Sequence, residues 1–466
     1  MARIGLTGLG TMGAALALNI AEKGFPVAVH NRSGAATEAF MAGAGELADR
    51  VTPAESLADL AAALDTPRAV IVMVKAGDAV DAVIDGLLPH LDAGDLIVDA
   101  GNADFNDTRR REAALRDDGI RFIGMGVSGG EAGARHGPSI MVGGPEESYA
   151  PIRDIVEAIA ARYKDTPCAA LLGPDGAGHF VKTAHNGIEY GDMQLIAEVW
   201  GILRDGQGRS PASAAALFRE WNGGPLQSYL VEITADVLAA TDPLAGGPMV
   251  EAILDRAGQK GTGRWTLIEA LKLGQSATVI EAAVAARSWS ARKDVRARGA
   301  QLFRDGDLRC RPVLDGELEE ALIAARIIAY GQGFALMAEA SEHFRWDLDL
   351  ARTAEIWRAG CIIRSGLLDD IAKSVRDGPP DGQLAFAPCF VERLHECMPA
   401  LRRVTGAAMG GGLPVPAMAA AVSWFDAMRQ ARGTADLVQA QRDYFGAHGF
   451  ERVDGRDAPH GPWHRS

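Results

Sequence analysis

The chain is poor in cysteine, and this shortage excludes several classes of protein. Five cysteines occur among 466 residues, and they are Cys168, Cys310, Cys361, Cys389 and Cys397. Their number is odd, and no two have the spacing of a zinc or redox pair, so neither a disulfide framework nor a metal site is predicted. Scattered reduced thiols are typical of a cytoplasmic protein, which is the location we expect.

Positive charge and long apolar runs are also scarce. Lys and Arg total 47 against 61 for Asp and Glu, which gives a formal charge of -14. Such a surface repels nucleic acid and anionic membranes, so we expect neither as a partner. No uninterrupted apolar run approaches the roughly 20 residues that span a bilayer. The N-terminal MARIGLTGLG enters a strand at once and leaves no room for a signal peptide. An anionic ligand would need a local basic patch.

The remaining composition is that of a globular protein with a large core, at 48% hydrophobic residues. Residues 1–177 alternate helical stretches with the short apolar runs RIGLT, PVAVH, AVIVMV, DLIVDA, RFIGM and SIMVG. This pattern predicts an α/β Rossmann-type domain with parallel strands and crossover helices. Residues 178–435 read as a large all-α domain, and 436–466 as a loop-rich C-terminal tail.

The helical region contains an apparent internal repeat. IEYGDMQLIAEVW at 188 returns as IAYGQGFALMAEA at 328, and WNGGPLQSYLVEI at 221 returns as WRAGCIIRSGLLDDI at 357. The motif order is the same, and the separations of 140 and 136 residues are similar. The pattern favours a duplicated helical unit, with chance similarity between helices as the alternative.

The glycine-rich segment GLGTMG, at 8–13, follows the first strand and opens a helix. In a strand–helix–strand unit this pattern predicts a dinucleotide site, with the helix N-terminus facing the phosphates. Gly8 permits the tight turn, Gly10 lets the backbone approach a pyrophosphate, and Gly13 lets helix and strand pack closely. A glycine turn without a ligand is the alternative.

The residues after the second strand indicate which dinucleotide binds. That strand ends in Asn31-Arg32-Ser33, where an NAD site would usually place an acid. Arg32 can pair with a 2′-phosphate, so the sequence favours NADP, although a surface arginine without this role is possible. Lys75 and Asn102 follow two further strands at the edge where ligands bind. The predicted cofactor-binding residues are Gly8, Leu9, Gly10, Thr11, Met12, Gly13, Asn31, Arg32, Ser33, Val74, Lys75, Ala76 and Asn102.

The stretch GHFVKTAHNGIEYGDMQ, at 178–194, predicts a helix that carries chemistry. Lys182, Asn186 and Glu189 stand at i, i+4 and i+7 on one face, with His185 beside them. Lysine can act as a base if burial lowers its pKa, and glutamate as an acid if burial raises its own. A solvated charged face is the alternative.

Two further glycine features accompany this helix. Gly187 and Gly191 interrupt it, and we interpret them as places where a neighbouring element or ligand comes close. Ser128-Gly129-Gly130, after another strand, offers a hydroxyl and open N–H groups that can hold a carboxylate. A plain turn is the alternative for that tripeptide.

Several long motifs together resemble the 6-phosphogluconate dehydrogenase family, within the β-hydroxyacid dehydrogenase superfamily. They are GHFVKTAHNGIEYGDMQLIAE, GVSGGEAGARHGPSIM, DRAGQKGTGRWT, WRAGCIIRS, LPVP and QAQRDYFGAH, and the resemblance runs from residue 3 to about 452. It implies NADP-dependent oxidation of the 3-hydroxyl of 6-phosphogluconate, loss of CO2 and formation of ribulose 5-phosphate. Lys182 would be the base and then an acid, Glu189 would deliver a proton at C1, and no metal would be needed.

The resemblance also implies a set of substrate contacts. The sugar acid would contact Asn102, Ser128, Gly129, Gly130, His185, Asn186 and Tyr190. The phosphate would contact Lys260 and Arg287, together with Arg442 and His448 from the tail of a partner subunit. The family therefore implies that the helical domain, residues 178–435, binds substrate and dimerises. It also implies that the tail, residues 436–466, completes the site of the partner subunit in a homodimer with exchanged tails.

Some positions depart from the family pattern. Thr183-Ala184 stand where Met-Val is usual, Arg264 where Lys is usual, and Cys389 where Tyr is usual. The ending DAPHGPWHRS differs from the usual Phe-His-Thr-x-Trp, which leaves open how the last ten residues pack. Two other functions remain open. One is a β-hydroxyacid dehydrogenase without decarboxylation, and the other is a non-catalytic NADPH sensor.

Overall fold

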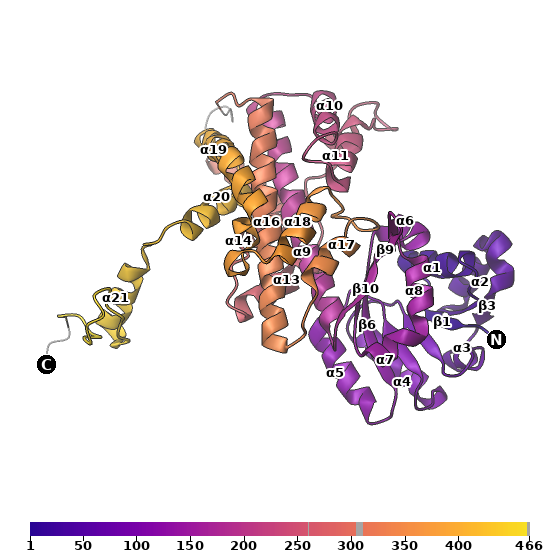
Figure 1. The fold of residues 1–466 in the computed structure, drawn as a ribbon. Coiled ribbons are helices and arrows are strands. Elements are labelled where there is room, and N and C mark those ends of the chain that lie inside the picture. The colour runs from indigo at the N-terminus through magenta and orange to yellow at the C-terminus, as the bar shows by residue number, and fades with distance from the viewer. Residues whose placement is uncertain (260, 304–310, 464–466) are drawn as a thin grey trace.

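In the computed structural model, which describes residues 1–259, 261–303 and 311–463, a twisted sheet and its helices lead into a bundle of long helices (Figure 1). The sheet has eight strands in the order β10-β7-β6-β5-β4-β1-β2-β3. Their bounds are β1 Ile4–Thr7, β2 Val27–His30, β3 Val51–Ala54, β4 Ala69–Val72, β5 Leu96–Asp99, β6 Arg121–Ser128, β7 Ser139–Gly143 and β10 Ala169–Gly173. Two short strands, β8 Arg162–Tyr163 and β9 Thr166–Pro167, pair separately.

The direction of β7 differs from the expectation of parallel strands throughout. It runs antiparallel to β6, with Gly124 opposite Gly143 and Ser128 opposite Ser139, whereas the other pairs in this sheet are parallel. The connection between the two strands is only the segment 129–138, which is shorter than the dozen or so residues that a parallel crossover needs. The chain therefore turns back along β6.

Helices cover both faces of the sheet, whose strands β1, β2, β4 and β5 are buried at every residue. This burial explains the continuous apolar runs seen in the sequence. The helices of this part are α1 Thr11–Glu22, α2 Gly34–Gly43, α3 Leu57–Ala62, α4 Asp78–Leu87, α5 Phe105–Arg116, α6 Gly130–His136, α7 Glu146–Tyr149 and α8 Arg153–Ile159.

The second part of the chain is helical and centres on two long helices. These are α9 Ala177–Gly201, which a π-turn at Ile202–Gly206 extends, and α16 Asp315–Phe344. The others are α10 Pro211–Trp221, α11 Tyr229–Ala239, α12 Met249–Ala252, α13 Thr262–Lys272, α14 Thr278–Ser290, α15 Lys293–Leu302, α17 Leu350–Ile356, α18 Leu367–Asp377, α19 Pro388–Gly410, α20 Pro416–Met428 and α21 Ala435–Gly446. One contiguous apolar core joins α9, α16 and the helices packed on them.

Helix α16 is apolar enough over 18 residues, at a mean hydropathy of 1.5, to pass a length-and-composition test for a membrane span. The sequence showed no uninterrupted apolar run of that kind, because polar residues break it. Of that window, 83% is buried inside the protein, as for the core helix of a globular domain.

The geometry of the helical domain agrees with an internal duplication. Ser228 and Ser365, which are 137 residues apart, form an antiparallel bridge between the two copies. The amide of Tyr229 donates to the carbonyl of Arg364 at 3.0 Å, and the amide of Gly366 donates to Gln227 at 3.1 Å. Corresponding residues of the two copies therefore pair with each other in this bridge.

The tail stands away from the helical bundle, with α21 at its centre (Figure 1). Asp443 of α21 is fully buried and accepts hydrogen bonds from the amides of Gly449 and Gly461 at 3.0 and 2.9 Å. It is also bonded to His460 Nδ1 at 2.7 Å and to Trp463 Nε1 at 2.8 Å. The atypical ending thus keeps the His and Trp of the family's usual ending, and both fold back onto one carboxylate.

Candidate functional site

Glycines let α9 lie directly against the sheet. A Cβ on Gly126 of β6 would lie 2.5 Å from the Cβ of Lys182, and one on Gly178 would lie 2.6 Å from the carbonyl oxygen of Met141. A residue with a Cβ at either position would prevent α9 from lying this close to the sheet. The start of α9 is thereby fixed beside the carboxyl end of β6, and Lys182 is placed at the edge of the sheet where ligands bind.

A chain of hydrogen bonds joins the predicted polar residues of α9. Lys182 Nζ donates to Asn186 Oδ1 at 2.7 Å, and His185 Nδ1 lies 3.2 Å from the same oxygen. The other ring nitrogen of His185, Nε2, lies 3.2 Å from Ser128 Oγ, and Nδ1 lies 3.8 Å from Glu189 Oε2. The structure therefore brings these five predicted residues into one cluster.

Burial sets the protonation of this cluster. Lys182 is 6% exposed, and burial lowers its pKa, although the charge of Glu189 partly opposes the shift. Burial raises the pKa of Glu189, against the opposing charges of Lys182 and Arg287. The pKa of His185 is well below its usual value because of burial and then of Lys182. Burial therefore favours the neutral forms of all three side chains, in which an amine can accept a proton and a carboxyl can donate one.

Residues from the second copy of the repeat pack against this cluster and against the Ser-Gly-Gly turn. Trp357 packs edge to face on His185 at 5.3 Å between ring centroids. The carbonyl of Gly360 accepts from the amide of Ser139 at 2.8 Å and lies where a Cβ on Gly129 would have to go. Gly129 has φ +108, so the Ser-Gly-Gly turn depends on a conformation that glycine readily adopts. Apart from the repeat, no pattern in the sequence indicates the role of Trp357.

The chemistry belongs to only one copy of the repeat. The positions 140 residues after Lys182, His185 and Glu189 hold Leu322, Ala325 and Ala329, and all three are buried. The copy on α16 has therefore become part of the core, while α9 keeps the polar face.

The two mid-helix glycines of α9 differ in their surroundings. A Cβ on Gly187 would lie 2.5 Å from Thr266 Cγ2 of α13, and Thr266 is fixed by a 2.8 Å bond to the carbonyl of Thr183. A Cβ on Gly191 would meet nothing nearer than Ala329 Cβ at 3.6 Å, which is an ordinary contact. The expectation of a close approach is right for Gly187 and wrong for Gly191.

The predicted phosphate ligands are only partly assembled within one chain. The guanidinium of Arg287 stacks on the ring of Tyr190, with 3.5 Å between Cζ and the ring centroid. Lys260 lies outside the described residues. Arg442 and His448 are exposed on the tail, which extends away from α9 (Figure 1), so this chain does not bring them to Lys182.

The GLGTMG turn has the geometry that the sequence predicts. Gly8 has φ +105, and a Cβ on Gly13 would collide with the carbonyl of Gly8. A Cβ on Gly10 would meet nothing within 4 Å, so the backbone faces open space at the N-terminus of α1. The amide of Leu9 donates to Asn31 Oδ1 at 3.0 Å, which ties this turn to the end of β2. These features fit a dinucleotide phosphate.

A cleft of about 690 Å³ runs from this turn to α13. Eight predicted residues line it, namely Gly10, Thr11, Met12, Gly13, Val74, Lys75, Ala76 and Asn102. Asp104, Thr262 and Trp265 also line it, and the sequence interpretation missed them, although the motif DRAGQKGTGRWT contains two of the three. Arg32 and Ser33 are exposed beyond the end of β2, where a 2′-phosphate could reach them.

Comparisons with known proteins agree with this geometry. A family model described as the C-terminal domain of 6-phosphogluconate dehydrogenase matches residues 178–463, and one for the NAD binding domain of that enzyme matches residues 3–173. The decarboxylating 6-phosphogluconate dehydrogenase of Haemophilus ducreyi is 48% identical over 97% of this chain and 94% of its own length. The Bacillus subtilis enzyme, described as NADP(+)-dependent and decarboxylating, is 45% identical over 99% of both.

A solved structure gives the same result. The Plasmodium falciparum 6-phosphogluconate dehydrogenase, described in its apo form, with its cofactor NADP+ and with its substrate 6-phosphogluconate, matches with a TM-score of 0.95 at 39% identity. The match covers 99% of this chain and 100% of that chain. Both the Rossmann-type part and the helical part are therefore shared.

Proposed function

This chain belongs to the 6-phosphogluconate dehydrogenase family, and from that premise we propose that it oxidises and decarboxylates 6-phosphogluconate with NADP. The observation that carries the proposal is the buried face of α9, where Lys182 and Glu189 have pKa values shifted in opposite directions. A dehydrogenase that stops at the keto acid needs a base, whereas decarboxylation also needs a proton donor for the product carbon. This face offers both groups.

The residues around the cleft fit NADP. The glycine turn and the N-terminus of α1 would hold the pyrophosphate, and Arg32 would pair with the 2′-phosphate. Lys75 and Asn102 line the same cleft. When bound there, NADP supplies the acceptor for the hydride that leaves C3 of the substrate.

The cluster on α9 would move the protons. Neutral Lys182 accepts the proton of the 3-hydroxyl as C3 is oxidised, and the resulting ammonium remains within reach of Asn186 Oδ1. The ammonium then donates its proton to the ketone oxygen while the β-carboxylate leaves as CO2, and the electrons of the broken C–C bond form the enediol. Lys182 takes this proton back from the oxygen as the enediol is protonated at carbon. Protonated Glu189 delivers a proton to the carbon that becomes C1 of ribulose 5-phosphate.

The remaining predicted residues would orient the substrate. Ser128, Gly129, Gly130, Asn102, His185 and Asn186 would hold the sugar acid. Tyr190 would also contact the sugar acid. Arg287 and Lys260 would hold the phosphate, completed by Arg442 and His448 of a second subunit. We propose that the protein is a homodimer with exchanged tails. The projecting α21 supports this, since it exposes Leu437, Val438, Tyr444 and Phe445. We also propose a cytoplasmic location, which free thiols at the four described cysteines support.

The direct test is to incubate the pure protein with 6-phosphogluconate and NADP and to follow NADPH and CO2 together. We expect both products, and a slower reaction when NAD replaces NADP. Absence of NADPH would overturn the substrate assignment. NADPH without CO2 would favour a β-hydroxyacid dehydrogenase that does not decarboxylate.

A further inference from the structure

Two loops line part of the cleft that we propose holds NADP. The first is the segment 73–77 between β4 and α4, and the second is the segment 100–104 between β5 and α5. Both contribute backbone and side chains to the cleft lining. A dinucleotide in the cleft would bind most tightly if these two loops kept one fixed separation.

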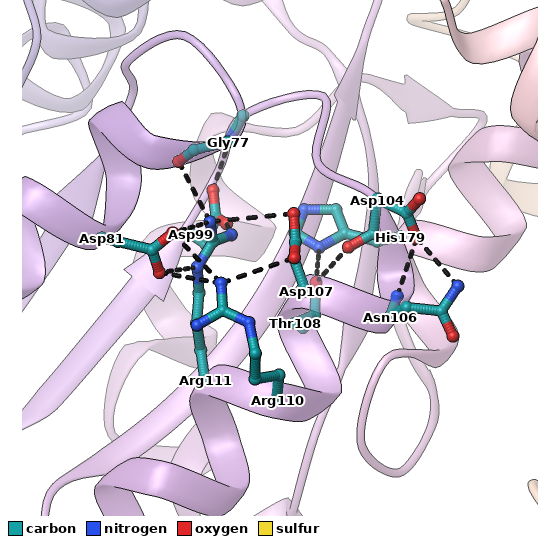
Figure 2. A network of polar contacts seen from close by, with 11 residues as sticks. Gly77, Asp81, Asp99, Asp104, Asn106, Asp107, Thr108, Arg110, Arg111 and His179 are labelled. Atoms are coloured by element: carbon teal, nitrogen blue, oxygen red, sulfur yellow. Dashed lines mark hydrogen bonds and ion pairs between the residues drawn. The ribbon is translucent and has the colours of Figure 1, made fainter.

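Arg111 of α5 is 2% exposed and lies next to Gly77 and Asp99, which border the two loops (Figure 2). Its Nη2 donates to the carbonyl of Gly77 at 3.1 Å, at the end of the first loop. Its Nη1 donates to Asp99 Oδ2 at 3.1 Å, at the start of the second loop. The other carboxylate oxygen of Asp99 accepts from the amide of Gly101 at 3.1 Å, next to Asn102. One guanidinium therefore reaches both loops.

A third contact fixes the guanidinium itself. Asp81 of α4 accepts from Arg111 Nε at 2.9 Å and from Nη2 at 3.1 Å, which is a two-pronged interaction. Arg111 lowers the pKa of Asp81 to about 2, so this carboxylate is charged at any working pH. Because the fork is planar and rigid, anchoring one edge on Asp81 also sets the direction of the remaining donors.

We propose that Arg111 is a positioning residue for cofactor binding, which holds the two loops at the separation that NADP requires. Arg111 is not among the residues that line the cleft, so it acts through Gly77 and Asp99 rather than by contact. The inference rests on the proposed use of NADP. It also predicts a larger effect on the cofactor than on the substrate. Of the proposed substrate contacts, Asn102 lies on one of these loops, whereas Lys182 and Ser128 are held by α9 and β6.

The test is Arg111→Lys, which keeps the positive charge beside Asp99 but lacks the fork. We expect the dissociation constant of NADPH, measured by calorimetry without substrate, to rise about tenfold, which is the size of loss seen when a residue that orients the direct ligands of a metal is replaced. The KM for 6-phosphogluconate should change much less. Arg110→Lys is the matched control. Arg110 is the neighbouring residue and also bonds Asp81, at 3.0 Å, but it contacts neither Gly77 nor Asp99.

If Arg111→Lys does not fold, Asp81→Asn gives a milder test. It leaves Arg111 in place, weakens its anchor and should raise the NADPH dissociation constant in the same direction by a smaller factor. A folded Arg111→Lys that binds NADPH as tightly as the wild type would overturn the proposal, as would an equal loss in Arg110→Lys. A similar rise in the NADPH dissociation constant and in the KM for 6-phosphogluconate, together with a lower melting temperature, would also overturn it. A wild-type protein that binds NADPH but does not convert 6-phosphogluconate with NADP would instead refute the proposed function.

Discussion

At the scale of single residues, one buried environment shifts the pKa values of Lys182 and Glu189 in opposite directions. Burial disfavours charge, so it lowers the pKa of the amine and raises that of the carboxyl. Their mutual attraction works against both shifts and does not cancel them. The site thereby holds a base and an acid seven residues apart on one helix, each closer to neutrality than it would be in water.

This arrangement predicts the pH dependence of turnover. The rate should rise with pH as Lys182 loses its proton, below the usual range for lysine. It should fall again as Glu189 loses its proton, above the usual range for glutamate. The two limbs belong to the coupled pair and are read from kcat against pH.

Glu189→Gln separates the two limbs. The amide cannot titrate, so the falling limb should disappear from the residual activity, which we expect to be lower by about a hundredfold or more. A falling limb that persists unchanged in this variant would remove Glu189 from the account.

At the scale of elements, the contacts of α9 predict opposite effects for two similar substitutions. Gly187→Ala would press a methyl group against Thr266, whose hydroxyl is bonded to two backbone carbonyls, so α9 and α13 would have to separate. We expect a lower melting temperature and reduced turnover. Gly191→Ala, one turn later, meets only ordinary contacts and should gain stability, by up to about 1 kcal/mol of helix propensity.

Thermal unfolding and kcat of the two variants check this prediction. Each is the control of the other, because both make the same change on the same helix. Equal effects in the two variants would show that helix propensity, and not the contact with Thr266, determines the effect of alanine at position 187.

A second element-scale prediction concerns the link between α9 and α20. Glu198 of α9 accepts from the amides of Ala417 and Met418 at 2.8 and 2.9 Å, in the first turn of α20. Burial raises the pKa of Glu198 from 4.5 to about 7, although these bonds oppose the shift. The folded protein therefore binds this proton more tightly than the unfolded chain does. The stabilisation is complete below pH 4.5 and is lost as pH rises through about 7.

Melting temperatures of the wild type and Glu198→Gln at several pH values measure this effect. The melting temperature of the wild type minus that of the variant should become smaller as pH rises from about 5 to 8. A difference that grows over the same range would mean that the carboxylate is charged in the fold, and would contradict the prediction.

The elements also show what sequence reasoning can and cannot predict. The GLGTMG turn was predictable because its glycines act on their immediate neighbours. Strand β3 was missed because its four residues include Pro53 and alternate weakly, as an edge strand can. Arg111 and Trp357 were missed because their roles depend on residues far away in the chain, and no local pattern marks such a contact.

At the scale of the whole molecule, the proposed exchange of tails predicts that one chain is not active alone. Arg442 and His448 lie on a segment that projects from the body, and in the proposed dimer they complete the site of the second subunit. Arg442→Ala and Lys182→Ala should each be nearly inactive. When they are unfolded and refolded together, mixed dimers should regain activity. Half of the dimers would then be mixed, each with one intact site, which gives about a quarter of the wild-type rate.

The reason is that one mixed-dimer site combines an intact body with an intact tail. Refolding each variant alone is the control and should restore nothing. No recovery in the mixture, with mixed dimers demonstrated by differently tagged chains, would mean that each tail serves its own chain.

The central claim is that one helix carries both the base and the acid of an oxidative decarboxylation. Its most direct test is the side-by-side release of NADPH and CO2 from 6-phosphogluconate by the wild type and by Lys182→Ala. We predict one CO2 for each NADPH in the wild type, and a loss of both products by at least about a thousandfold in a folded variant. Unequal release by the wild type, or turnover by Lys182→Ala near the wild-type rate, would contradict the account.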